Sequence, residues 1–143
     1  MVQQPPEGFE PHSRRSPLTI PWEPIYARKT PDRIVLGLFV GEAHTNSRGL
    51  LHGGLIAAMA DNAMGLSCGQ LMADRGLTYS GMVTVSLGVD YLGQAQIGDW
   101  LEVDTSFVRT GRTLCFTGAE IIANGEPIAR AHATFRVHTS SSS

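Results

Sequence analysis

Hydrophobic and polar residues alternate along several stretches of the chain, and this pattern predicts β-strands. The stretches are residues 33–42, 80–92, 99–109, 112–123 and 126–138. A period of two places successive side chains on opposite faces of a strand. Between the last two stretches, Asn124-Gly125 is a dipeptide that favours a tight hairpin turn. We therefore expect extended strands that are joined by short turns.

Three of these stretches have one face that should line a hydrophobic core. In the first, that face carries Ile34, Leu36, Leu38 and Val40. In the second, it carries Val83, Val85, Leu87, Val89 and Tyr91. In the last, it carries Ala129, Ala131, Ala133, Phe135 and Val137.

Residues 49–73 break this alternation and predict a helix. The stretch is rich in alanine, leucine and methionine, and apolar residues occur on all of its sides. A helix without a polar face is expected to be buried. A membrane span is the other reading, but the Asp61-Asn62 pair at its middle and several glycines disfavour it.

The first 32 residues have a different character, because they hold most of the eight prolines together with Trp22 and Tyr26. Such a composition disfavours helices and predicts an extended arm that packs over the domain. We expect residues 33–138 to form that domain and residues 139–143 to be a disordered tail.

The predicted order of strand, long helix and four strands indicates an α+β fold. A flat sheet covers only one side of a buried helix, so we expect an antiparallel sheet of five to six strands that wraps around it. A sheet wrapped around one long central helix is the hotdog fold. Its edges remain open in one chain, which predicts a homodimer. A dimer of dimers, which is a homotetramer, is the alternative that the sequence leaves open.

Composition narrows the classes of function. The chain has 143 residues, of which 42% are hydrophobic and 17% charged, and its net charge is -2. This balance disfavours disorder and supplies no basic field for nucleic acid. The first residues lack the apolar run of a secretory signal, so we expect a cytoplasmic protein with no membrane partner. Cys68 and Cys115 have no paired spacing and are expected to be buried free thiols, with no metal site.

The candidate chemistry centres on Asp61, the one carboxylate of the predicted helix before its last turn. His52-Gly53-Gly54 precedes it, and free N–H groups at a helix start can stabilise an oxyanion. A carboxylate and an oxyanion donor are the two parts that acyl transfer requires. Along one helix they stand roughly 12 Å apart, so a dimer is needed to bring Gly53 near the Asp61 of another chain. A structural role for Asp61 in an interface network is the alternative.

The stretch NSRGLLHGGLIAAMADNAMG, residues 46–65, resembles the signature of the hotdog-fold acyl-CoA thioesterase family that includes PaaI and thioesterase superfamily member 2. A weaker resemblance covers residues 33–138. The resemblance to this family implies hydrolysis of an acyl-CoA to a free acid and CoA without a metal or cofactor. Asp61 is then the nucleophile or general base, and the Gly53 N–H polarises the carbonyl across a dimer interface.

The resemblance implies further roles. Asn46 and His52 match residues that line the thioester end of the pocket, and Thr84 matches the hydroxyl residue that helps hold the water. Gly54, Arg109, Gly111 and Arg112 are the predicted substrate-binding residues. The two arginines fall at a hairpin turn, where guanidinium groups could meet the phosphates of CoA or face solvent.

Two other functions fit parts of the sequence. A hotdog hydratase or dehydratase would use His52 and Asp61 together as general acid and base. A non-catalytic acyl-CoA-binding module would bind the thioester without releasing thiol, but the 32-residue arm is too short and too proline-rich for a DNA-binding appendage.

Overall fold

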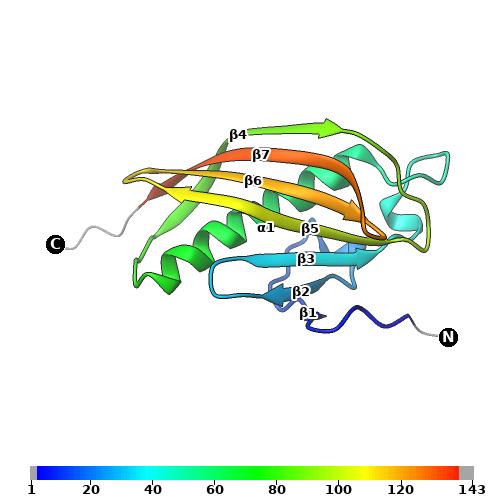
Figure 1. Cartoon of the computed structure of the whole chain (residues 1–143), viewed down its shortest axis with the longest axis horizontal. Helices are drawn as coiled ribbons and strands as arrows, with labels where there is room; N and C mark the ends of the chain where they lie inside the picture. The colour runs from blue at the N-terminus through cyan, green and yellow to red at the C-terminus, as the bar shows by residue number, and fades with distance from the viewer. Residues whose placement is uncertain (1–2, 139–143) are drawn as a thin grey trace.

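One long helix, α1 (Gly53–Asp74), lies against a single antiparallel sheet in the computed structural model, which describes residues 3–138 (Figure 1). The predicted disordered tail at 139–143 lies outside the described residues. The strands are β1 (Glu10–Pro11), β2 (Tyr26–Lys29), β3 (Ile34–Phe39), β4 (Gly81–Tyr91), β5 (Trp100–Thr110), β6 (Leu114–Ala123) and β7 (Glu126–His138). Two short 3-10 helices, η1 (Ile20–Trp22) and η2 (Glu42–His44), complete the elements.

The strand order across the sheet is β1-β2-β3-β5-β6-β7-β4. The predicted α+β hotdog arrangement is confirmed, but the sheet has seven strands instead of five to six, because residues 10–11 and 26–29 add β1 and β2 at one edge. Strand β4 pairs only with β7 and forms the opposite edge. Residues 92–99 therefore cross the sheet to reach β5, where a short turn between neighbouring strands was expected.

Helix α1 begins at Gly53, four residues later than predicted. Gly49 has a positive φ of 74°, and His52 is extended, so neither residue can continue a helix. The His52 ring instead caps the helix, because its Nδ1 accepts the Gly54 N–H at 2.8 Å. The prediction of a helix start at Gly49 is wrong because it rested on composition, and a helix boundary depends on capping.

The core lies between α1 and the sheet. The predicted inner face of β7 is confirmed, since Ala129, Ala131, Ala133, Phe135 and Val137 are all buried. From β3, Leu36 and Leu38 join the same cluster. On the helix, Met59, Ala60, Ala63 and Met64 are almost fully buried against this surface. Close packing of small alanines under larger helix side chains therefore holds the layers together.

Strand β4 departs from its predicted pattern. The pairing with β7 shifts between Thr84 and Ser86, so Val85 is an extra residue in a β-bulge. Such a bulge reverses which side chains face the helix on either side of it. Thr84 lies opposite the buried Phe135, and Val83 lies opposite Arg136. The residues that were predicted to share one core face therefore do not share it; they are Val83, Val85, Leu87, Val89 and Tyr91. Most of them are exposed: Val83 52%, Val85 59%, Leu87 38% and Tyr91 51%.

The N-terminal residues cover the other edge of the sheet. Phe9 packs edge-on against Trp100 with ring centroids 5.1 Å apart, and both belong to a second buried cluster with Val35. The Trp100 ring lies directly on Gly37, where a Cβ would collide with it. The Arg28 guanidinium stacks over the Phe9 ring at 4.8 Å. The apolar side chains in this region are therefore packed against other side chains of the same chain.

The two cysteines are buried, as expected, but they are not free. Cys68 of α1 and Cys115 of β6 form a disulfide, with Cα atoms 6.8 Å apart. The prediction of free thiols is wrong. The sequence did not reveal the pairing, because the two cysteines are 47 positions apart and only the packing of the helix on the sheet brings them together.

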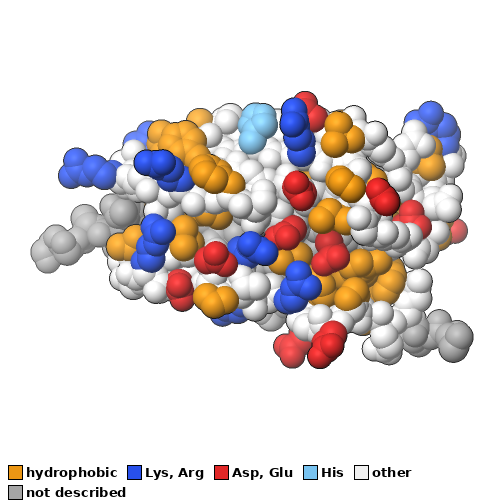
Figure 2. All heavy atoms as spheres, viewed as in Figure 1, with side chains coloured by type: hydrophobic (Ala, Val, Ile, Leu, Met, Phe, Trp, Pro, Cys, Tyr) orange, Lys and Arg blue, Asp and Glu red, His pale blue; other side chains and the backbone are white. Residues whose placement is uncertain are grey.

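The outward face of the sheet carries charges of both signs. Figure 2 shows acidic and basic side chains interspersed over this face. Cross-strand ion pairs join Arg130 to Asp90 at 3.0 Å and Arg33 to Asp104 at 3.1 Å. The face shown therefore presents no continuous basic field of the kind that binds nucleic acid. Within residues 3–138, no helix has the length and apolar character needed to cross a membrane.

Candidate active site

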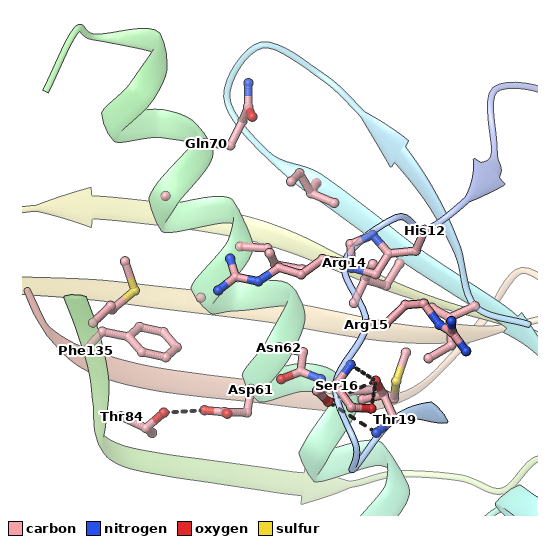
Figure 3. Close-up of a pocket in the computed structure, with 18 of the residues that line it drawn as sticks. His12, Arg14, Arg15, Ser16, Thr19, Asp61, Asn62, Gln70, Thr84 and Phe135 are labelled. Atoms are coloured by element: carbon pink, nitrogen blue, oxygen red, sulfur yellow. Dashed lines mark hydrogen bonds between the residues drawn. The ribbon is translucent and has the colours of Figure 1, made fainter. Parts of the chain in front are cut away.

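Asp61 and Thr84 meet at the wall of a cavity with a volume of about 660 Å³. The Thr84 hydroxyl donates a 2.6 Å hydrogen bond to Asp61 Oδ1, as Figure 3 shows. The β-bulge at Val85 makes this contact possible by turning Thr84 toward the helix. Asp61 is half-buried, where full burial was expected, because this side of the helix is open to the cavity.

The cavity extends along the helix from Asp61 to Gln70, a length of roughly 13 Å at 1.5 Å per residue. Apolar side chains also line it, with Leu66 from the helix, Met82 from β4 and Phe135 from β7. Gly65 leaves this part of the helix bare, since a Cβ there would already touch the Phe135 ring at 3.5 Å. The cavity therefore combines the polar Asp61–Thr84 pair with apolar wall residues.

Residues of the N-terminal arm form the remaining wall. His12, Arg14, Arg15, Ser16 and Thr19 all line this cavity (Figure 3). Arg15 donates to Glu23 at 2.7 Å, and this partner raises the pKa of the guanidinium. Burial lowers the pKa of the His12 imidazole, and the neighbouring charge of Arg14 adds to this effect. His12 is thus held in its neutral form over a wider pH range than an exposed histidine.

A second, smaller cavity of about 200 Å³ lies beside the start of helix α1. Asn46, Arg48, Gly53 and Tyr91 are among its lining residues. The Asn46 carboxamide oxygen accepts the N–H groups of Arg48 at 2.9 Å and Leu50 at 3.2 Å, which holds the loop before the helix in shape. This cavity therefore contains the predicted amide and glycine of the site, but not the carboxylate.

Gly53 itself is fixed by Tyr91, whose hydroxyl donates to the Gly53 carbonyl oxygen at 2.6 Å. The next N–H of the helix, that of Gly54, is already taken by His52 Nδ1. Among residues 3–138, no acceptor is recorded for the Gly53 N–H. A free N–H at the positive end of a helix is suited to stabilise an oxyanion.

The structure does not bring all predicted site residues together. Asp61 and Thr84 line one cavity, and Asn46 and Gly53 line the other. His52 and Gly54 are exposed beside the second cavity without lining it. Arg109, Gly111 and Arg112 are exposed around the β5–β6 hairpin and line neither cavity. That hairpin contacts the end of α1, where Arg75 donates to the Thr110 hydroxyl at 3.3 Å.

Two features of the site were not predicted from sequence. Tyr91 was expected in the core, but its hydroxyl positions Gly53. Arg14 and His12 were assigned only to an arm, but both line the Asp61 cavity. The sequence contained one signal of this position, namely two adjacent arginines inside a proline-rich segment that was expected to pack over the domain.

Comparison with known proteins identifies the family. A profile described as the thioesterase superfamily matches residues 48–129. The chain belongs to the thioesterase superfamily. It is 36% identical to a Pseudomonas aeruginosa protein named "Putative esterase PA0474", over 92% of this chain and 96% of that one. Human acyl-coenzyme A thioesterase 13 is 32% identical over 73% of this chain and 72% of its own length.

A solved structure agrees with these relatives. The crystal structure of a hypothetical thioesterase from Streptococcus pneumoniae with coenzyme A has a TM-score of 0.71 and 27% identity, covering 82% of this chain and 88% of that chain. The expected membership of the hotdog thioesterase family is confirmed, and with it the class of enzyme: this thioesterase is a thioester hydrolase.

Proposed function

We propose that this thioesterase hydrolyses acyl-CoA in a catalytic centre built from two copies of the chain. One copy supplies Asp61 and Thr84, and the other supplies Gly53 and Asn46. The observation that carries the proposal is the division of these residues between two cavities on one helix. Gly53 and Asp61 are eight residues apart, roughly 12 Å along the helix, which is too far for both to act on one carbonyl.

The exposed edge of the sheet supports pairing with a second copy. Strand β4 carries Thr84, which lines one cavity, and Tyr91, which lines the other. Its side chains at Val83, Val85 and Leu87 are exposed in a single chain. A long, apolar edge strand without a partner favours association. A dimer through β4 would cover this edge and bring unlike cavities of the two chains together.

The chemistry follows from the atoms at hand. Thr84 orients Asp61 through Oδ1, and no hydrogen bond to the carboxylate's second oxygen is made within residues 3–138. That oxygen either attacks the thioester carbonyl or takes a proton from a water that attacks it. The carbonyl oxygen gains negative charge, which the Gly53 N–H stabilises. The C–S bond then breaks and the thiolate of CoA takes a proton. When water is the attacking group, the free acid is formed in this step. When Asp61 attacks, the acyl group is left as a mixed anhydride on Asp61, and a water molecule hydrolyses that anhydride to the free acid and the carboxylate.

The geometry favours this reaction over hydration or dehydration. A hydratase needs a histidine that can exchange a proton beside the carboxylate. The Nδ1 of His52 is engaged with the Gly54 N–H, and His52 does not line the Asp61 cavity. Arg109, Gly111 and Arg112 stay predicted contacts for the nucleotide phosphates of CoA, which are expected to lie outside both cavities.

The test is thiol release from a panel of acyl-CoAs by the wild type, Asp61→Asn and Asp74→Asn. Asp74 is an exposed carboxylate at the end of the same helix and serves as the matched control. We expect Asp61→Asn to lose turnover at least about 100-fold, and Asp74→Asn to keep it. Full turnover by a folded, dimeric Asp61→Asn protein would refute the proposal. Hydration of crotonyl-CoA without thiol release would favour the hydratase instead.

A further inference from the structure

We propose that Arg14 recognises a carboxylate at the far end of the acyl group, so that this thioesterase prefers thioesters of dicarboxylic acids. The inference rests on the proposed function, because it takes the thioester carbonyl to lie beside Asp61. It adds the class of acyl group and a residue that selects it.

Arg14 carries a positive charge that is available to bind an anion. Within residues 3–138, Arg14 forms no ion pair, whereas the neighbouring Arg15 is held by Glu23. In Figure 3, Arg14 reaches across helix α1, and Arg15 points away from it. Arg14 also stays more than 4 Å from the Asp61 carboxylate, since no ion pair joins them. The cavity therefore holds one guanidinium that is free to bind an anion.

Arg14 lies farther along the cavity than Asp61. In the view of Figure 3, its side chain lies between the levels of Asn62 and Gln70, and Asp61 and Thr84 lie at one end. Gln70 and Tyr79 line the same cavity beyond Asp61. The apolar residues Leu66, Met82 and Phe135 also line it. A ligand that matches these walls has a thioester beside Asp61, methylenes against the apolar residues and an anionic group that reaches Arg14.

Two groups of an acyl-CoA could supply the anion that Arg14 binds. A carboxylate at the end of the acyl chain and a phosphate of CoA can both pair with a guanidinium. The cavity has a volume of about 660 Å³ and includes apolar wall residues, which suits an acyl chain. The nucleotide of CoA carries several phosphate charges and a single guanidinium would leave most of them unpaired. We therefore assign the anion to the acyl group.

The experiment compares thioesters of equal length that differ only at the far end, such as adipyl-CoA and hexanoyl-CoA, with shorter and longer pairs beside them. We expect wild-type kcat/KM to favour the carboxylate member. In Arg14→Gln, kcat/KM for adipyl-CoA should fall about 10- to 100-fold, while hexanoyl-CoA changes less than about twofold. Arg14→Lys should recover part of the preference. Arg136→Gln is the control, because it removes an exposed arginine that lines neither cavity, and it should leave the preference unchanged.

Thioesters of pantetheine separate the two anions, because they lack the nucleotide and its phosphates. If Arg14 binds the acyl carboxylate, the loss in Arg14→Gln persists with adipyl-pantetheine. If Arg14→Gln weakens both CoA thioesters equally and neither pantetheine thioester, Arg14 binds phosphate and the inference is overturned. Equal kcat/KM of the wild type for adipyl-CoA and hexanoyl-CoA at every length would also overturn it.

A binding measurement separates this inference from the proposed reaction. Calorimetry with Asp61→Asn measures the affinity for adipyl-CoA and hexanoyl-CoA without turnover. A tighter complex with adipyl-CoA that is lost in Asp61→Asn/Arg14→Gln supports Arg14 whatever the catalytic residue is. Equal affinities overturn the inference. Absence of thiol release from every thioester by the wild type would refute the proposed function alone.

Discussion

The cavity beside Asp61 and the cavity beside Gly53 lie along the same helix but differ in what they can do. The first, of about 660 Å³, contains a carboxylate, a hydroxyl and a free guanidinium. The second, of about 200 Å³, contains an amide and a free backbone N–H. One can attack a carbonyl, and the other can stabilise the oxyanion that results. Under the proposed function, this difference makes the two cavities of each chain complementary halves of a centre that two chains complete.

The largest effect should come from charging the strand that borders both cavities. Val85→Lys places a cation at the exposed bulge of β4, and a lysine on an edge strand prevents pairing with another chain. We expect a folded monomer with turnover close to background. Ile97→Lys is the matched control, since Ile97 is 52% exposed but lies outside the strands. Light scattering and thiol release check both variants; an active Val85→Lys monomer would contradict the division of the site.

The next effect concerns the donor of the smaller cavity. Gly53→Pro removes the N–H at the first helical position, where proline is well tolerated. Turnover should fall about 10²- to 10³-fold, as for loss of an oxyanion donor. Gly53→Ala is the control, because it keeps the N–H and places the same Cβ 3.3 Å from the Tyr91 ring. Equal losses in the two variants would assign the effect to crowding of Tyr91.

A smaller effect is expected at the hydroxyl of the larger cavity. Thr84→Val keeps the shape of the side chain but removes the 2.6 Å hydrogen bond to Asp61. We expect kcat to fall about 10-fold, the size of one hydrogen bond to a charged group. Thr84→Ser retains the hydroxyl and should stay within about threefold of wild type. An unchanged kcat in Thr84→Val would show that Asp61 needs no orienting partner.

The smallest effect is on stability and involves the arm. Burial and Arg14 lower the pKa of His12 in the folded state below the unfolded value of about 6.5. The unfolded chain therefore binds the proton more readily, and this contribution to stability is lost as the pH falls below that value. Thermal unfolding at pH 7.5 and 5.5 should show a loss of stability at the lower pH that is smaller in His12→Gln than in the wild type. An equal loss in both proteins would contradict the direction of the pKa shift.

Local patterns predicted much of the fold. Alternation in β7 placed Ala129 to Val137 on the inner face correctly, because that strand is regular and central. In β4 the same reasoning was wrong, since a single extra residue at Val85 changes the facing side and leaves no mark in composition. The disulfide between Cys68 and Cys115 was missed for a similar reason, because tertiary packing alone makes them neighbours.

The site was predictable in its residue types and less so in its arrangement. Asp61 stood out as an isolated carboxylate in an apolar helix, and the structure places it at a cavity with Thr84. The helix rise also predicted that Gly53 could not reach it within one chain. The arginines at 14 and 15 were visible in the sequence, but their position in the wall of the Asp61 cavity could not be predicted, because the path of a proline-rich arm depends on contacts that are distant in sequence.

Complementation between two inactive proteins tests the shared centre most directly. A mixed dimer of Asp61→Asn and Gly53→Pro chains, purified through two different tags, contains one site with both defects and one site with neither. If the centre is built across the interface, the mixed dimer recovers about half of the wild-type turnover, although each parent dimer is nearly inactive. If each chain carried a complete site of its own, every site in the mixed dimer would hold one defect, and turnover would stay at the level of the parents.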